Sequence, residues 1–128
     1  MKKILLDTNS YVAFKQNRED VVETIRHVDY IGMNSIVFGE LLAGFKGGSR
    51  EAQNRKELDE FLDSPRVEQI SVNDETAEYY AKIFSDLKSR GLPIPSNDLW
   101  IAASAMQHGL ALYTLDAHFQ KINGLLLK

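Results

Sequence analysis

The stretch Lys3-Ile4-Leu5-Leu6-Asp7-Thr8-Asn9 decides the fold. Three consecutive apolar residues, followed by an acid and by two residues that favour helix N-caps, predict a short buried strand that runs directly into a helix. Apolar runs at 30–33, 67–72, 110–114 and 125–127 predict further strands, and helical patterns fill the intervals between most of them. Strands that alternate with helices form a parallel sheet covered on both faces, so we expect an α/β fold.

The composition is that of a small globular protein. Of its 128 residues, 44% are hydrophobic, which is enough to fill one core, so residues 1–128 are expected to form one domain. There is no cysteine, which excludes zinc–thiolate sites and cysteine nucleophiles. The first apolar run is too short for a signal peptide, and no later run approaches the roughly 20 apolar residues of a membrane span, so a cytoplasmic location is expected.

The overall charge argues mildly against a nucleic-acid partner. Fifteen basic and eighteen acidic residues give a net charge of −3, whereas phosphate binding usually needs a basic balance. That argument weakens if several of the acids are clustered around metal ions.

Two acids follow the carboxyl ends of predicted strands. Asp7 comes directly after the first strand, and Asp116 follows the strand at 110–114. In an open parallel sheet, the loops that leave the carboxyl ends converge on the ligand-binding crevice. Both aspartates are therefore expected at the same edge of the sheet.

Two further acids lie on helix faces with apolar or small neighbours. Asp98 is in the first turn of the helix predicted to begin at Ser96, and Glu40 is in the helix that follows Asn34. The neighbours on the same helix face are Ile101, Ala102 and, two turns on, Ala105 for Asp98, and Ile36, Val37, Ala43 and Gly44 for Glu40. A carboxylate on a buried face costs free energy unless a partner satisfies it.

Four such carboxylates near one another repel, and a divalent cation removes the repulsion. Oxygen ligands without cysteine or histidine favour Mg2+ or Mn2+. Other interpretations stay open: Asp7 and Asp98 could be helix-capping acids. Glu40 could pair with a basic residue such as Lys46, and Asp116 could be an ordinary turn residue. Their joint occurrence favours a metal site.

Four stretches share their order and spacing with a known family. They are Leu5–Asn9, Asn34–Gly44, Gly91–Ala103 and Leu112–Phe119. Each is a weak motif alone, but together they cover nearly the whole chain and are specific. They resemble the PIN domains, and in particular the VapC-type toxins. Trp100 departs from the pattern, because smaller aliphatic residues are common there.

The resemblance implies a parallel sheet of about five strands in the order 3-2-1-4-5. It also implies a catalytic metal site with one or two Mg2+ or Mn2+ ions on Asp7, Glu40, Asp98 and Asp116. Asn9 and Thr114 match positions that often line the same pocket. The fourth acid is sometimes an asparagine in the family, so Asp116 is the ligand that the resemblance supports least.

The resemblance further implies an endoribonuclease that hydrolyses RNA phosphodiester bonds with metal-activated water. The implied partners are an RNA substrate, a cognate antitoxin and a second copy of the chain in a homodimer. An antitoxin peptide is expected near the acids, with an arginine placed among them.

Substrate binding must come from outside the acidic centre. Lys46, Arg50, Arg55 and Lys56 gather around a double glycine and outnumber the acids there, which suggests an RNA-binding patch. A solvated helix face is the slightly favoured alternative. His118 lies close to Asp116 and could face the site, but a catalytic role for it is the less favoured interpretation.

The clearest amphipathic helix starts at residues 73–75, with apolar residues at Ala77, Tyr80, Ala81, Phe84 and Leu87. The aromatic residues Tyr79, Tyr80 and Phe84 of this helix favour a core or dimer contact over a base-stacking platform.

Two other functions stay open. One is a PIN-like domain that has lost catalysis and serves as an RNA- or protein-binding module, although retention of all four acids argues against it. The other is an aspartyl-phosphate phosphatase, since Asp7 follows the first strand. Such enzymes usually carry a second aspartate two residues on, where this chain has Asn9.

Overall fold

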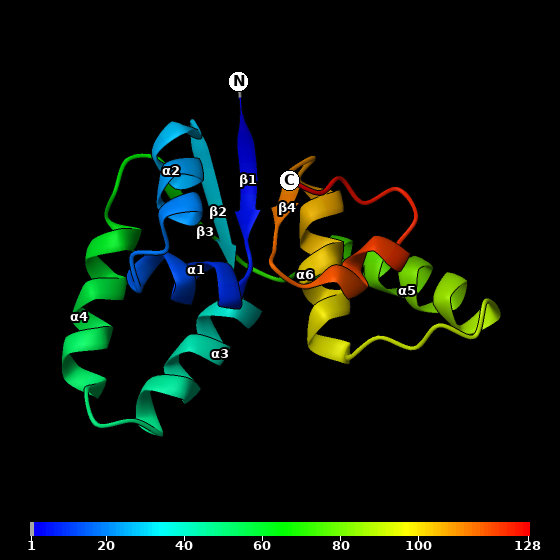
Figure 1. Cartoon of the computed structure of the whole chain (residues 1–128). Helices are drawn as coiled ribbons and strands as arrows, with labels where there is room; N and C mark the ends of the chain where they lie inside the picture. The colour runs from blue at the N-terminus through cyan, green and yellow to red at the C-terminus, as the bar shows by residue number, and fades with distance from the viewer. Residues whose placement is uncertain (1) are drawn as a thin grey trace.

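The computed structural model describes residues 2–128 (Figure 1). Strands and helices alternate as predicted, and their order along the chain is β1 Lys3–Leu6, α1 Thr8–Lys15, α2 Glu19–His27, β2 Tyr30–Asn34, α3 Ser35–Lys46, α4 Glu51–Leu62, β3 Val67–Ile70, α5 Asp74–Ser89, α6 Ser96–Gln107, β4 Ala111–Tyr113 and the 3-10 helix η1 Ala117–Lys121.

The sheet is parallel throughout and has the strand order β3-β2-β1-β4. This confirms the predicted α/β fold and the order of the first four strands. The prediction of a fifth strand at 125–127 is wrong, because only an isolated bridge forms there. A single parallel bridge joins Leu127 to Leu112, with Leu112 donating its N–H to the Leu126 carbonyl at 2.8 Å. The Lys128 N–H donates in turn to the Leu112 carbonyl at 3.0 Å, and β4 itself ends at Tyr113.

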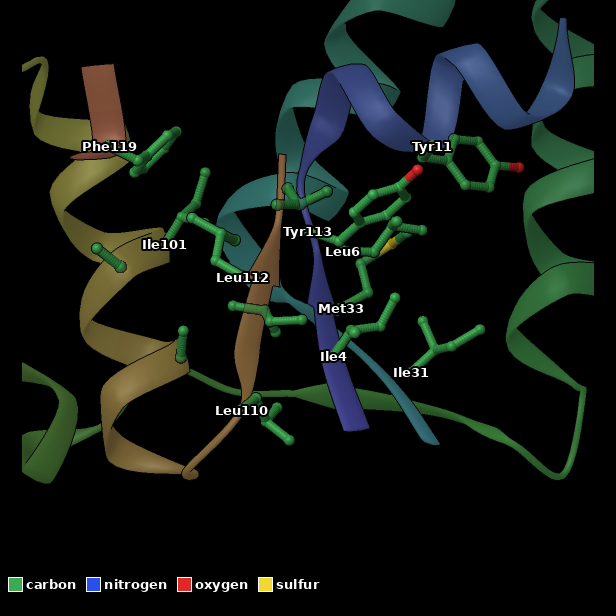
Figure 2. Close-up of a cluster of buried hydrophobic side chains, with 14 of the residues drawn as sticks. Ile4, Leu6, Tyr11, Ile31, Met33, Ile101, Leu110, Leu112, Tyr113 and Phe119 are labelled. Carbon is green, nitrogen blue, oxygen red and sulfur yellow. The ribbon is translucent and has the colours of Figure 1, made fainter. Parts of the chain in front are cut away.

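Helices cover both faces of the sheet, as buried parallel strands require. In Figure 1, α1, α2 and α4 lie to the left of the strands and α5 and α6 to the right, while α3 extends below their carboxyl ends. The hydrophobic core likewise has two parts, one on each face of the sheet. Figure 2 shows side chains from β1, β2 and β4, with Ile101 of α6 on one side and Tyr11 of α1 on the other; Ile4, Leu5 and Leu6 are fully buried.

Two strand-to-helix junctions at the carboxyl edge hold polar residues in fixed positions. Asp7 is the N-cap of α1, and Asn34 is the N-cap of α3. Asn34 is fully buried: its oxygen accepts the N–H of Val37 at 2.9 Å, and its amide donates to the Ser104 hydroxyl at 3.1 Å. This bond ties the start of α3 to α6 and so fixes the two helices that carry Glu40 and Asp98.

The apolar row of α5 lies in the core only in part: Leu87 is buried and Tyr80 is half-buried, whereas Ala77, Ala81 and Phe84 are exposed. The buried residues of this helix are Thr76, Ile83 and Leu87, whereas Phe84 is 48% exposed. Thr76 is buried because its hydroxyl is satisfied by Asn73 and Gln107. A pattern of apolar residues alone cannot detect that polar contact. None of the helices between residues 2 and 128 combines the length and apolar character needed to span a bilayer.

Candidate metal centre

Asp7 is the most buried acid of the candidate site, with 5% of its surface exposed. Its Oδ1 accepts the N–H of Thr8 at 2.7 Å, and its Oδ2 accepts the hydroxyl of Thr114 at 2.7 Å. Each carboxylate oxygen therefore has one donor and keeps a free lone pair. The capping interpretation of Asp7 is correct as far as it goes, but one carboxylate serves both as a cap and as a potential ligand.

Thr114 links Asp7 to the loop that follows β4. Besides donating to Asp7, its hydroxyl accepts the N–H of Asp116 at 3.0 Å. Asp116 in turn is the N-cap of η1, where its Oδ1 accepts the N–H of His118 at 3.1 Å. The predicted pocket position of Thr114 thus corresponds to a specific contact with the site.

His118 lies between Asp98 and Asp116. Its Nε2 is 2.5 Å from Asp98 Oδ2, and its Nδ1 is 2.7 Å from Asp116 Oδ1. One potential ligand atom from each of these three side chains lies within 4.8 Å of the others. Asp98 comes from the first turn of α6, whose residues Ile101 and Ala102 are fully buried, so this helix face packs inward as predicted.

Glu40 is half-buried on α3 and approaches the same edge. Its Oε1 accepts the Thr8 hydroxyl at 2.6 Å, and its Oε2 accepts the Asn97 amide at 3.4 Å. The alternative pairing with Lys46 does not occur, because Lys46 binds Glu51 at 3.0 Å. The expected buried face around Glu40 is wrong at its carboxyl-terminal end, where Ala43 and Gly44 are exposed because α3 extends beyond the sheet.

The pKa of Asp7 is set by its burial, its hydrogen bonds and its acidic neighbours. Burial raises the pKa of its carboxyl group, and the charges of Asp98 and Glu40 raise this pKa further, against hydrogen bonds from Thr114 and Thr8 that lower it. Among residues 2–128, no lysine or arginine forms a salt bridge with any of the four acids. A divalent cation fits this oxygen-rich set, because it supplies positive charge that no lysine or arginine of residues 2–128 provides to these acids.

The remaining predicted residues lie farther out. Asn9 is exposed in the first turn of α1, and within residues 2–128 its side chain makes no hydrogen bond to the acids. The four basic candidates lie along the end of α3 and on α4. Lys46 and Arg55 are engaged with Glu51 and Asp59, and the guanidinium of Arg55 lies 5.6 Å from the Phe38 ring centre. Arg50 and Lys56 are exposed.

Three contacts were missed by sequence reasoning. The sequence patterns predict Thr8 only as a helix cap, they predict no role for Asn97, and they favour a non-catalytic His118. A signal existed for each: Thr8 and Asn97 are sequence neighbours of Asp7 and Asp98, and His118 lies two residues after Asp116 at the start of a helical turn.

Comparison with known proteins places this geometry in a family. The model of the PIN domain matches residues 4–125. Ribonuclease VapC2 of Rickettsia felis is 32% identical over 129 residues, covering 97% of this chain and 95% of that protein. Ribonuclease VapC1 of Haemophilus influenzae strain R2866 is 31% identical, covering 94% of this chain and 92% of that protein.

Solved structures agree with the sequence relatives. The structure of VapBC2 from Rickettsia felis bound to a promoter DNA fragment contains a chain with a TM-score of 0.89 and 30% identity, covering 98% of this chain and 97% of that one. VapBC-1 from nontypeable Haemophilus influenzae gives a TM-score of 0.87 at 29% identity, with coverage of 98% and 96%. The chain therefore belongs to the PIN domain family, and within it resembles the VapC proteins along nearly its whole length.

Proposed function

We propose that this chain is a metal-dependent endoribonuclease and the toxin of a VapBC-type toxin–antitoxin pair. The observation that carries the proposal is the buried Asp7 carboxylate, which lies among Asp98, Glu40 and the Asp116 loop without a lysine or arginine partner in residues 2–128. The ribonucleases to which the chain is similar supply the reaction class.

The acids have different tasks in this proposal. Asp7 and Asp98 hold Mg2+ or Mn2+, since their carboxylates are anchored by donors that leave lone pairs free. A bound divalent ion makes water easier to deprotonate and stabilises charge on the phosphate and the leaving oxygen. Glu40, oriented by Thr8 and Asn97, holds the ion or orients the attacking water.

RNA binding is assigned to Lys46, Arg50, Arg55 and Lys56. Their exposed side chains lie along the end of α3 and on α4, outside the acidic centre. Cations at that distance can hold phosphates that flank the scissile bond without neutralising the carboxylates. Replacing Arg50 and Lys56 by glutamine should weaken RNA binding, measured by salt-dependent filter binding, and leave the metal affinity unchanged. Equal RNA affinity would remove this patch from the proposal.

A cognate antitoxin is the proposed protein partner, because the similar solved structures are VapBC assemblies. A hollow of about 280 Å³ between α1, α3 and α4 offers a place for its peptide chain. It is lined by Tyr11, whose buried hydroxyl has no hydrogen-bond partner within residues 2–128. Burial and the charge of Glu57 raise the pKa of Tyr11 to about 12, so the hydroxyl stays a neutral donor for such a peptide.

The proposed inhibitory contact is an antitoxin arginine among the acids. Neutralising Asp7, Glu40, Asp98 and Asp116 together to the corresponding amides should weaken antitoxin binding in a calorimetric titration. Unchanged affinity of the quadruple variant would refute this geometry.

A homodimer is proposed through the exposed aromatic face of α5 and α6. Tyr80 stacks on Trp100 with ring centres 4.2 Å apart, and Phe84 stacks on Tyr80 at 6.2 Å. Phe84→Glu should shift the mass measured by light scattering toward the monomer, while Ser85→Glu, on the same helix, should not. A monomeric wild type would contradict the proposal.

The metal dependence of cleavage tests the proposed activity. Purified protein, freed of antitoxin, is incubated with a mixture of transfer, ribosomal and messenger RNA in Mn2+ or Mg2+, then with EDTA, and then with the ion restored. Cleavage should stop with EDTA and return with the ion. Cleavage that persists in EDTA would refute a metal-dependent mechanism, and no cleavage despite bound metal would favour a binding module.

A further inference from the structure

The hollow between α1, α3 and α4 contains a polar group that the fold does not use. Tyr11 lines this hollow and is 2% exposed, and its hydroxyl has no hydrogen-bond partner within residues 2–128. The ring points away from the strands in Figure 2 and is held by an edge-on contact with Phe61 of α4, with ring centres 5.2 Å apart. Buried hydroxyls in native proteins are nearly always hydrogen-bonded, so an unpaired one beside a hollow indicates a missing partner.

The hollow begins one helical turn from the acidic centre. The Tyr11 N–H donates to the Asp7 carbonyl at 3.1 Å, so the two residues are about 5.4 Å apart along the axis of α1. Arg50, the N-cap residue of α4, also lines the hollow and belongs to the basic patch assigned to RNA. An RNA strand that is cut beside Asp7 and held at Arg50 therefore passes over the hollow.

The side chains around the hollow match the face and the edge of a nucleobase. Gln16 and Asn54 each carry an amide that can donate and accept, and Phe45 of α3 supplies an aromatic ring. Proteins recognise single-stranded RNA by this combination, in which a base stacks on an aromatic or guanidinium plane and its edge forms hydrogen bonds. Small-ligand pockets start at about 300 Å³, so a hollow of about 280 Å³ suits a single base.

The charges around the hollow favour an anion. Lys15 and Glu57 line it and form an ion pair at 3.7 Å, with 37% and 29% of their side chains exposed. Arg50 forms no salt bridge within residues 2–128, so its guanidinium can bind a phosphate. Two cations against one acid leave one net positive charge, which suits the phosphate of a nucleotide.

We propose that this hollow is a nucleotide subsite beside the acidic centre. One base of the RNA enters the hollow, the Tyr11 hydroxyl donates a hydrogen bond to that base, and Arg50 binds the adjoining phosphate. The inference rests on the proposed function, because it concerns the RNA that is cut at the acidic centre. The antitoxin peptide proposed for the same hollow then competes with the base, so its release opens the subsite as well as the acids.

The test measures binding of single-stranded RNA hexamers to the Asp98→Asn protein, which should leave them uncut. Four hexamers carry only A, C, G or U, and a fifth is the same ribose–phosphate chain without bases. The Kd values come from the anisotropy of a fluorescent label, in lithium salt to keep the G hexamer single-stranded. At least one base should bind more tightly than the abasic chain. Adding Tyr11→Phe should weaken that binding by about 2- to 10-fold, as for one neutral hydrogen bond, and leave the abasic chain unchanged.

Tyr30→Phe is the matched control, because it removes a tyrosine hydroxyl that donates to Glu68 at 2.8 Å and does not line the hollow. It should leave all five Kd values unchanged. Tyr11→Phe should not lower the Tm, since its hydroxyl has no partner in the fold. A lower Tm would mean that the hydroxyl already has a structural partner, and would count against the subsite.

Three outcomes separate this inference from the proposed function. Equal Kd values with and without Tyr11→Phe, for a wild type that cleaves RNA in Mn2+, would overturn the subsite and leave the nuclease intact. Weaker antitoxin binding by Tyr11→Phe with unchanged RNA binding would assign the hollow to the peptide alone, and would also overturn it. A wild type that does not cleave RNA, together with no binding of any hexamer, would overturn both.

Discussion

Replacing Thr114 by valine tests the contact that supports the buried Asp7. The two side chains have nearly the same shape, so the change removes the hydroxyl that donates to Asp7 Oδ2 at 2.7 Å and leaves the packing intact. A hydrogen bond to a charged group contributes about 1.5–3 kcal/mol to stability, and a neutral one about 0.5–1.5 kcal/mol. Because Asp7 is 5% exposed, water cannot readily replace the lost donor, and we expect this bond to contribute about 2 kcal/mol.

The assay is thermal unfolding of the metal-free protein at neutral pH. For 128 residues the entropy of unfolding is about 0.27 kcal/mol/K, so a loss of about 2 kcal/mol lowers Tm by about 7 °C. The same change in an Asp7→Asn background removes only a neutral bond and should cost about 1 kcal/mol, or about 4 °C. Any cost from the N–H of Asp116, which also loses its acceptor, occurs in both backgrounds and cancels.

The direction with pH follows from the same contact. The Thr114 hydroxyl lowers the pKa of Asp7 by stabilising the carboxylate, so its removal should cost most where Asp7 is ionised and least in acid. Equal losses of Tm in the two backgrounds would refute the reasoning, because they would mean that Thr114 does not act on a charged Asp7.

Further predictions concern the stability of the site and of the core. Asp7→Asn should raise the Tm of the metal-free protein at pH 7. Burial raises the pKa of Asp7 in the folded state, so the protonated carboxyl group stabilises the fold below the ordinary pKa of 3.8. This stabilisation is lost as pH rises through the folded-state pKa, because the buried group then becomes charged. A Tm advantage that does not grow between pH 4 and pH 7 would contradict this. Mn2+ at 100 times its Kd should stabilise the wild type by about 2.7 kcal/mol, or about 10 °C, and Asp7→Asn much less; an equal shift in both would place the ion elsewhere. Leu112→Ala, at a fully buried position of β4, should cost about 2–5 kcal/mol in denaturant unfolding, and a loss below 1 kcal/mol would mean that the strand is not packed as described.

Much of the fold follows from local patterns in the sequence. Three apolar residues ended by Asp7 predict a short buried strand, and the alternation of strands with helices predicts a parallel sheet. The partly exposed apolar row of α5 is a feature that such local patterns do not predict. Tyr80 is held by stacking on Trp100, a residue of another helix, and no periodicity within α5 contains that contact.

The candidate site likewise contains residues whose positions the sequence predicts and residues whose positions it does not. The rule that parallel strands present their carboxyl ends at one edge brings Asp7 and Asp116 together from the sequence alone. The role of His118 depends on the turn of η1 and on its position beside α6, which determine where both ring nitrogens point. Geometry of that kind arises from packing between distant segments and is not encoded in residue spacing.

The most direct test of the central claim is the initial rate of RNA cleavage in Mn2+ by the wild type, Asp98→Asn and Asp74→Asn. Both aspartates lie in the first turn of a helix, so the two variants lose the same charge at similar helix positions. Asp98→Asn should lower the rate by more than about 100-fold, as expected when a metal ligand is lost, and Asp74→Asn should cleave like the wild type. Wild-type cleavage by Asp98→Asn would contradict the assignment of the reaction to this acidic centre.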